Sequence, residues 1–235
     1  MNGQWLLSDF HIHTKFSDGS LGLSEVVNLY GKNAVGAISI TDHILDQQSF
    51  EFCIQNEQNP MVISKTNFND YLHTLWGEAR RAWEEFGMLL IHGVEITKNT
   101  KGYHILAIDI KKYIEPGLPV EEIADRIHAQ GGIAIAPHPQ RGALDGTQQH
   151  MYLWNNHEKF TPLFDAWEMA NRDDLFNVVG LHKFNYIANS DFHEKRQLYS
   201  WKTIVGCDKN VEAVKQALRK NDAVSIYLSR EGKVL

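Results

Sequence analysis

Histidine is the unusual residue of this 235-residue chain, because its 12 copies are about twice what average usage gives. Two of them stand in Asp9-Phe10-His11-Ile12-His13, where the alternation of a strand places Asp9, His11 and His13 on one face. Two imidazoles so placed are typical ligands of a divalent metal ion. An isolated pair of this kind is also a frequent chance pattern, so the prediction depends on the residues that accompany it.

Other imidazoles and carboxylates stand where later apolar runs begin or end, or in a turn close to the first run. They are Asp18, His43, Glu95, His104, His138, Asp191 and His193. Any one of them alone is more often a hydrogen-bonded core or surface residue. Burying nine titratable groups together is costly, however, unless metal ions neutralise them. Nine mixed ligands are too many for one ion, so we expect two or three divalent ions, Zn, Mn or Fe.

Such a cluster would do hydrolytic chemistry on an anion. Three divalent ions held by three carboxylates leave a charge of about +3, which attracts phosphate although the net charge of the chain is -6. Ions about 4 Å apart can activate a water as hydroxide and stabilise charge on the phosphoryl and leaving oxygens. The residues therefore predict hydrolysis of a phosphoester by a metal-bound hydroxide, without an amino-acid nucleophile.

Short apolar runs rich in Val and Ile must position these residues, and helical patterns separate the runs. The runs lie at 5–10, 35–40, 88–91, 104–110, 133–136, 166–169, 186–188, 203–205 and 224–228. Helices are expected at 24–30, 66–86, 120–130 and 210–219. Runs that lack clean alternation predict strands buried on both faces, as in a parallel sheet.

Strand and helix alternate without a break in composition, so the prediction is one α/β domain over residues 1–235. Seven or eight strands in this length are compact for an eightfold barrel, which favours a distorted barrel with short helices. The segment 44–65 interrupts the rhythm, because it is polar and has no clear period. We expect it to be either a lid over the site or a plain surface insertion.

In their order along the chain, these residues resemble the PHP family, the polymerase and histidinol phosphatase phosphoesterases. The family pattern is HxH, a downstream SDG, TDH, GVE, an isolated His, HP and a final DxH, and it is matched from His11 to His193. Each piece is weak by itself, but the ordered set is specific. The resemblance implies a distorted (β/α)7 TIM-like barrel, the PHP fold, with a trinuclear metal site. It is strongest to the small stand-alone bacterial members, since the chain has neither a polymerase body nor a large inserted domain.

Carried over position by position, the resemblance implies three sets of ligands. The first ion takes His11, His13, Glu95 and Asp191, the second takes Asp18, His43 and His193, and the third takes His104 and His138 with Glu95 as a bridge. In relatives, arginines near the metals grip the substrate phosphate, and the candidates here are Arg141 and Arg172. Asp9 and Asp42 are expected either to orient ligand histidines or to be structural hydrogen-bond acceptors.

Charge and composition argue against several other classes. A net charge of -6 disfavours a general grip on nucleic acid or on a membrane, so nucleic acid is expected only as a substrate. The first residues contain no signal segment, and no apolar stretch reaches the roughly 20 residues of a membrane span, so we expect a cytoplasmic protein. Cys53 and Cys207 form no CxxC pair and indicate neither a disulfide framework nor a thiolate zinc site.

The leading hypothesis is a histidinol-phosphatase-like phosphomonoesterase acting on a small phosphorylated substrate. The alternative is a phosphodiesterase or exonuclease acting on short oligonucleotides or nucleotides, since relatives of this kind include nucleases. Amide hydrolysis ranks lower, because a trinuclear cluster suits tetrahedral phosphoryl oxygens better than a carbonyl carbon. A non-catalytic metal-binding domain would require ligand positions that have decayed, and none has here.

Overall fold

The structure, a computed structural model, describes residues 4–56, 61–139, 141–142 and 149–231. The helices are α1 Leu23–Lys32, α2 Gln47–Gln55, α3 Phe68–Phe86, α4 Val120–His128, α5 Tyr152–Asn155, α6 His157–Phe160, α7 Asn177–Leu181 and α8 Val211–Lys220, with 3-10 turns at Asn99–Lys101, Thr161–Leu163 and Lys195–Tyr199. The strands are β1 Gln4–Ile12, β2 Ala37–Ile40, β3 His43–Leu45, β4 Leu89–Lys98, β5 Tyr103–Ile108, β6 Ile133–Ala136, β7 Arg141–Gly142, β8 Gln149–His150, β9 Ala166–Asn171, β10 Asp174–Leu175, β11 Tyr186–Asn189, β12 Trp201–Cys207 and β13 Val224–Leu228. None of the described helices combines the length and the hydropathy that crossing a bilayer requires.

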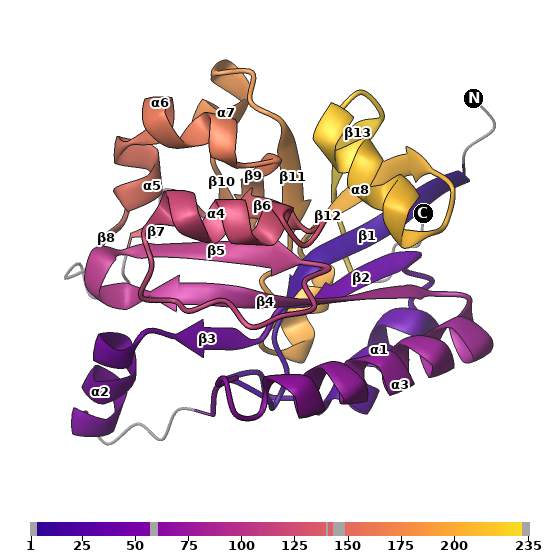
Figure 1. Cartoon of the computed structure of the whole chain (residues 1–235). Helices are drawn as coiled ribbons and strands as arrows, with labels where there is room; N and C mark the ends of the chain where they lie inside the picture. The colour runs from indigo at the N-terminus through magenta and orange to yellow at the C-terminus, as the bar shows by residue number, and fades with distance from the viewer. Residues whose placement is uncertain (1–3, 57–60, 140, 143–148, 232–235) are drawn as a thin grey trace.

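Most of the strands belong to one curled sheet. Its order is β10-β9-β6-β5-β4-β2-β1-β12-β13, with β11 paired to β9 and β3 paired to β4. An isolated bridge between Ile12, at the end of β1, and Phe192, just after β11, brings two distant parts of this sheet together. Figure 1 shows α1 and α3 lying together below the sheet, with α4 and α8 above it.

The nine expected strands and the four expected helices are all present, so the mixed α/β class is confirmed. The sheet is not wholly parallel, however. β5 runs antiparallel to both β4 and β6, and β12 runs antiparallel to both β1 and β13. The expectation of a parallel sheet was therefore wrong for these strands. Between β4 and β5 the reason is local, because a three-residue 3-10 turn ending at Gly102 is far too short for a crossover helix.

The two faces of the curled sheet are filled separately. The inner cluster draws apolar side chains from eight strands and from α8. It contains Leu6, Phe10, Ala37, Ile91, Leu106, Ile108, Ile133, Ile135, Ala166, Ile187, Val205, Val214, Ala217 and Leu218. The outer cluster, which is the larger one, packs α1, α3 and α4 against the outer face of the sheet. Each fully buried Leu, Ile or Phe contributes about 1.5–3 kcal/mol, so both layers hold the strand ends, and the residues on them, in place.

β1 does not keep its alternation to the end. Phe10 belongs to the inner cluster whereas Ile12 belongs to the outer one, and the pairing with β2 shifts register between Asp9 and Ile12. Asp9 accepts a hydrogen bond of 2.9 Å from Tyr30 of α1, whereas His11 faces the inside of the curl. The expectation that Asp9 shares a face with His11 was wrong, because the irregularity separates their directions.

The segment 44–65 is more regular than its composition suggested. It begins in β3, which pairs in parallel with β4. Asp46 then caps α2, since its carboxylate accepts a hydrogen bond of 3.0 Å from Ser49 N. Residues 57–60 lie outside the described residues. The alternatives of a lid and a surface insertion both stay predictions for this segment.

Asp165, a partly buried aspartate just before β9, gives a prediction on stability. Asp165 accepts hydrogen bonds from His128 of α4 and from Ala134 N of β6, both at 2.9 Å, and from Arg219 of α8 at 3.1 Å. Burial raises the pKa of Asp165, but these donors outweigh it and hold the pKa below its ordinary value of 3.8. A lowered folded-state pKa stabilises the fold above the unfolded-state pKa, and that stabilisation is lost as the pH falls.

We therefore expect Asp165→Asn to lower the free energy of unfolding by about 1–3 kcal/mol at pH 7, and by less as the pH drops below about 4. Urea denaturation at pH 7 and pH 3.5 measures both values. A deficit of the same size at the two pH values would contradict a contribution from the charge of Asp165.

Candidate metal centre

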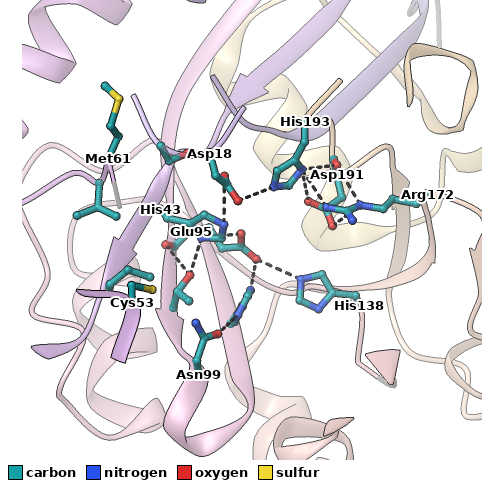
Figure 2. Close-up of a pocket in the computed structure, with 15 residues that line it drawn as sticks. Asp18, His43, Cys53, Met61, Glu95, Asn99, His138, Arg172, Asp191 and His193 are labelled. Atoms are coloured by element: carbon teal, nitrogen blue, oxygen red, sulfur yellow. Dashed lines mark hydrogen bonds and ion pairs between the residues drawn. The ribbon is translucent and has the colours of Figure 1, made fainter. Parts of the chain in front are cut away.

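The structure brings all nine predicted ligands together at one edge of the curled sheet. Figure 2 shows several of them, from segments far apart in the sequence, pointing toward one another. They come from β1 and the turn after it, from the starts of β3 and β5, from the middle of β4, and from the segments after β6 and β11. His104 stands at the beginning of its strand, whereas His11 and His138 stand at or after the ends of theirs. They meet because β5 runs antiparallel to its neighbours, so its first residues lie at the edge where the parallel strands end.

Glu95 is the centre of the group, with 1% of its surface exposed. Its Oε2 lies 3.2–3.3 Å from nitrogens of His11, His13 and His43. Its Oε1 lies 2.8 Å from His104 Nδ1 and 3.2 Å from His138 Nε2. One carboxylate thus touches five imidazoles, which is the arrangement expected of a bridging ligand.

Four atoms of the centre, two nitrogens and two oxygens, lie at equal nitrogen–oxygen distances. They are His11 Nε2, His13 Nε2, Glu95 Oε2 and Asp191 Oδ1, and each nitrogen lies 3.3 Å from each oxygen. Four ligands placed tetrahedrally at about 2.0–2.1 Å from a zinc-like ion are separated from one another by about 3.3–3.4 Å. These four residues are the set that the resemblance assigns to the first ion, and their four nitrogen–oxygen distances match those expected for ligands that share an ion.

The remaining predicted ligands gather beside this set. Four groups could each hold an ion: His13 with Asp18, His43 and His193; His11 with His13 and Glu95; His11 with His138 and Asp191; and His43 with Glu95 and His104. The group around Asp18 contains the three residues expected on a second ion. His138 and His104 fall in different groups, although both contact Glu95 Oε1. The allotment of each ligand to an ion stays a prediction.

Known proteins resemble this chain in sequence and in fold. No family model matches the chain. Over 181 residues it is 29% identical to the uncharacterized protein MJ1587 of Methanocaldococcus jannaschii, covering 75% of this chain and 90% of that one. A two-domain protein of Bacteroides vulgatus, which contains a predicted PHP-like metal-dependent phosphoesterase, superposes with a TM-score of 0.72 at 23% identity. The match covers 97% of this chain but only 66% of that protein's length.

The chain has the PHP-like fold. The resemblance drawn from the motifs is thus confirmed for the architecture. An amidohydrolase of Chromobacterium violaceum, solved with bound sulfate and no metal, has the same general architecture with a TM-score of 0.51 at 16% identity, over 79% of this chain and 87% of that one. A shared fold does not fix the chemistry, so the side chains must decide it.

The donor atoms at the centre of this PHP-like fold suit a divalent cation. His11 Nε2, His13 Nδ1 and His13 Nε2 are buried and have no hydrogen-bond partner among the described residues. Buried polar atoms are almost always paired, so unpaired nitrogens that face two carboxylates indicate a missing positive partner. A cation with borderline character accepts both imidazole nitrogen and carboxylate oxygen. The residues present therefore fit the metal dependence that the fold implies.

The electrostatics of the centre point the same way. Burial raises the pKa of Glu95, but the nearby imidazoles of His11, His104 and His43 outweigh it and hold the pKa well below its ordinary value. Burial lowers the pKa of His13, yet the carboxylates of Asp191 and Glu95 raise it to about 9. In His43 burial prevails and lowers the pKa to about 3. The Glu95 carboxylate thus stays ionised and attracts positive charge, for which protons and metal ions compete.

Glu168 is a functional candidate that sequence reasoning missed. This fully buried carboxylate on β9 lies 2.8 Å from His11 Nδ1. A carboxylate only accepts hydrogen bonds, so His11 Nδ1 carries the proton and Nε2 presents its lone pair to the centre. Glu168 also accepts hydrogen bonds from His138 N, Asn171 and Asn189 at 2.5–2.9 Å. A carboxylate within the apolar run 166–169 was the signal that could have revealed it.

His43 and His104, two other candidate ligands, also have a polar partner on one ring nitrogen. Thr97 Oγ1 lies 2.7 Å from His43 Nδ1, and Asn99 Oδ1 lies 3.0 Å from His104 Nε2. An amide oxygen accepts the Nε2 proton of His104, which leaves Nδ1 directed at Glu95. These partners fix ring orientations before any ion binds.

Asp9 and Asp42 do not contact ligand imidazoles through hydrogen bonds, and both act as structural acceptors. Asp42 accepts hydrogen bonds from Thr14 N at 2.7 Å, from Thr14 Oγ1 at 2.9 Å and from Ser17 Oγ at 2.7 Å. Asp9 accepts from Ser190 N at 3.1 Å and from Ser190 Oγ at 2.6 Å. Each carboxylate therefore holds a loop that carries a predicted ligand, rather than the ligand itself.

The arginine candidates have different outcomes. Arg172 follows β9 and lines the pocket over the centre, with its Nε 3.1 Å from Asp191 Oδ2 and its Nη2 2.9 Å from His193 Nδ1. The side chain of Arg141 lies outside the described residues.

Arg172, His138 and Asp191 all have positive φ, at 49°, 27° and 47°. Such strain in residues without glycine's freedom is held by the surrounding fold and concentrates at functional sites.

Proposed function

We propose that this chain is a PHP-type phosphoesterase that hydrolyses a small phosphomonoester at two or three divalent ions, Zn, Mn or Fe. The observation that carries the proposal is the set of four nitrogen–oxygen distances of 3.3 Å that join His11 and His13 to Glu95 and Asp191. The curled sheet is read as a distorted (β/α)7 barrel, in which β1, β2, β4, β5, β6, β9 and β11 are joined in one ring by the bridge at Phe192. The cytoplasmic location and the absence of a membrane partner stay predictions.

The reaction converts a phosphomonoester dianion and water into an alcohol and hydrogen phosphate, with cleavage of the bond between phosphorus and the leaving oxygen. Divalent ions, when bound, would polarise the phosphoryl oxygens and lower the pKa of an attacking water. The chain's own residues do the rest. Glu95 and Asp191 supply the negative charge that holds the ions, and Glu168 keeps the Nε2 lone pair of His11 directed at them. Arg172 presents a guanidinium to the phosphate.

Arg172 gives a testable prediction on substrate binding. Among the described residues that line the pocket it is the one arginine, and none is a lysine. We expect Arg172→Lys to raise KM for a phosphomonoester about tenfold, because lysine keeps the charge but loses the planar fork that matches phosphate oxygens. Steady-state kinetics measures this, with Arg196→Lys as the matched surface control, since Arg196 is 78% exposed. An unchanged KM would remove Arg172 from the phosphate site.

The proposal is tested by phosphate release from metal-reconstituted protein. A panel of monoesters, diesters and amides is offered with Zn, Mn or Fe, and the His11→Ala variant excludes a contaminating phosphatase. We expect monoester turnover that the variant loses. Turnover of diesters alone would support the phosphodiesterase or exonuclease alternative. Turnover of amides alone would support the amidohydrolase chemistry that a structural neighbour bears, and no turnover with any metal would favour a non-catalytic metal-binding role.

A further inference from the structure

The pocket over the metal centre has two chemically different sides. Its volume is about 500 Å³. One side carries Arg172 and His193, and the opposite side, beyond His43, is lined by four apolar side chains: Leu45, Cys53, Met61 and Val62. Figure 2 shows Cys53 and Met61 across the cluster of ligands from Arg172. We call these four residues the apolar wall.

The apolar wall is joined to the metal centre by short paths. His43 and Leu45 are two residues apart on β3, so both face the pocket while Ile44 between them is fully buried in the core. Ile63 follows Val62 in the sequence, and its backbone N–H donates a hydrogen bond of 2.8 Å to His43 O. The position of the wall is therefore coupled to the same strand that presents a ligand imidazole.

The helix that carries Cys53 is anchored as well. Ser49, in the first turn of α2, accepts a hydrogen bond of 3.0 Å from Asn99 N. Asn99 is also the residue whose amide oxygen meets His104 Nε2 at 3.0 Å. Asn99 thus links the first turn of α2 to His104, a ligand expected on the third ion. The parts of the apolar wall on β3 and α2, Leu45 and Cys53, are therefore held in place before a ligand binds.

The charges around the pocket restrict what the apolar wall can accept. Lys65, the lysine next in sequence to the wall, is 75% exposed and lies 3.2 Å from Glu115. Lys98 donates to Gly117 O. No arginine or lysine lies on the wall side of the pocket in the described part of the chain. A second phosphate or a carboxylate on the leaving group would lose its hydration there without gaining a positive partner.

We infer that the apolar wall is a leaving-group subsite, which selects phosphomonoesters of small, neutral and largely apolar alcohols. This inference rests on the proposed function of the metal centre. The phosphate lies between the ligands and Arg172, and the organic group extends over Leu45, Cys53, Met61 and Val62. A pocket of about 500 Å³ accommodates a single ring.

Two pairs of ligands test the subsite. Benzyl phosphate and ribose 5-phosphate are both esters of primary alcohols, so their leaving groups differ in polarity more than in reactivity. Benzylphosphonate and 2-hydroxyethylphosphonate are not hydrolysed, and calorimetry measures their binding directly. We expect the benzyl member of each pair to be preferred by tenfold or more, since loss of even a small apolar contact changes selectivity by about 10–200-fold.

The variants Leu45→Gln and Met61→Gln keep the size of each side chain and make the apolar wall polar. We expect each to reduce the benzyl preference about tenfold in both assays, mainly through KM in the kinetic one. Phe52→Gln is the matched control, because Phe52 is on the same helix as Cys53, does not line the pocket and is as exposed as Met61, both at 59%. Metal content and melting temperature are measured for every variant to show that the centre is intact.

The outcomes separate the subsite from the chemistry. Selective binding of benzylphosphonate that the wall variants lose supports the subsite even if no phosphate is released, and in that case only the proposed function fails. Phosphate release with equal preference for the two esters, or a benzyl preference that survives both wall variants, overturns the subsite and leaves the proposed function standing. Loss of the preference in Phe52→Gln would likewise overturn the assignment to this wall.

Discussion

Glu95→Gln is expected to reduce phosphate release by about 10³-fold or more and to lower the number of bound metal ions. The substitution keeps the size of the side chain but removes its charge and one of its two acceptor oxygens. Those oxygens approach five imidazoles within 3.3 Å, so this carboxylate is shared by most of the histidines of the centre. Stabilisation by metal ions supplies several kcal/mol to a phosphoryl transition state, and about 1.4 kcal/mol corresponds to each factor of ten in rate.

The measurement combines phosphate release at saturating substrate with elemental analysis of dialysed protein. Glu85→Gln is the matched control, because Glu85 on α3 is half exposed and pairs only with Arg81 among the described contacts. A surface pair of this kind is worth little, so the control should keep its metal and its activity. Full activity or a full complement of ions in Glu95→Gln would contradict the central role of this carboxylate.

Glu168→Gln is expected to weaken metal binding by about 10–100-fold, the usual cost of losing an outer partner of a ligand histidine. Glu168 Oε1 accepts from His11 Nδ1 and Asn189, and Oε2 accepts from His138 N and Asn171. Glutamine has only one oxygen for these donors. Its amide NH₂ must either face the backbone N–H of His138 or donate to His11 Nδ1, and the second choice moves the His11 proton to Nε2, where the ion should bind.

A purely structural role for Glu168 would give a different pattern. Loss of packing alone would lower the melting temperature of the metal-free protein and leave the His11 tautomer unchanged. Nitrogen-15 NMR of the imidazoles reports the tautomer, and metal titration reports the affinity. A normal tautomer together with normal metal affinity in Glu168→Gln would show that Glu168 does not orient His11.

The nine candidate ligands could be predicted from sequence because their chemistry is local. Eight of them stand close to the beginning or end of an apolar run, as with Glu95 after 88–91 or Asp191 after 186–188, and Asp18 stands in a turn after the first run. Burial of an ionisable group is costly wherever it occurs, so several such groups beside strands already indicate a shared positive partner. The same local logic predicted the strands and the long helices, since hydrophobic periodicity reflects which faces are buried.

The direction of β5 could not be predicted in this way. A run that is buried on both faces has the same composition whether its neighbours are parallel or antiparallel. The short link between β4 and β5 fixes the reversal, and this reversal carries His104 to the edge where Glu95 lies. An all-parallel sheet would have placed the start of that strand at the opposite edge.

Contacts between residues that are far apart in the sequence could not be predicted either. Glu168 and His11 are 157 positions apart, and Leu45 and Met61 both line the pocket although α2 lies between them in the sequence. The apolar run 166–169 marks Glu168 as unusual, but it does not identify His11 as the partner of Glu168. The irregularity in β1, which turns Asp9 away from His11, likewise depends on how β1 pairs with β2.

The sequence by itself thus determined the kinds of atoms in this protein's centre, their positions beside strands, and the mixed α/β class, because each depends on residue type and short-range pattern. The tertiary structure alone decided which of those atoms share a centre, which carboxylate orients His11, and which apolar side chains face the pocket. Those properties depend on distances between strands that are remote in the chain. Such distances are set by strand order, strand direction and packing of the whole core.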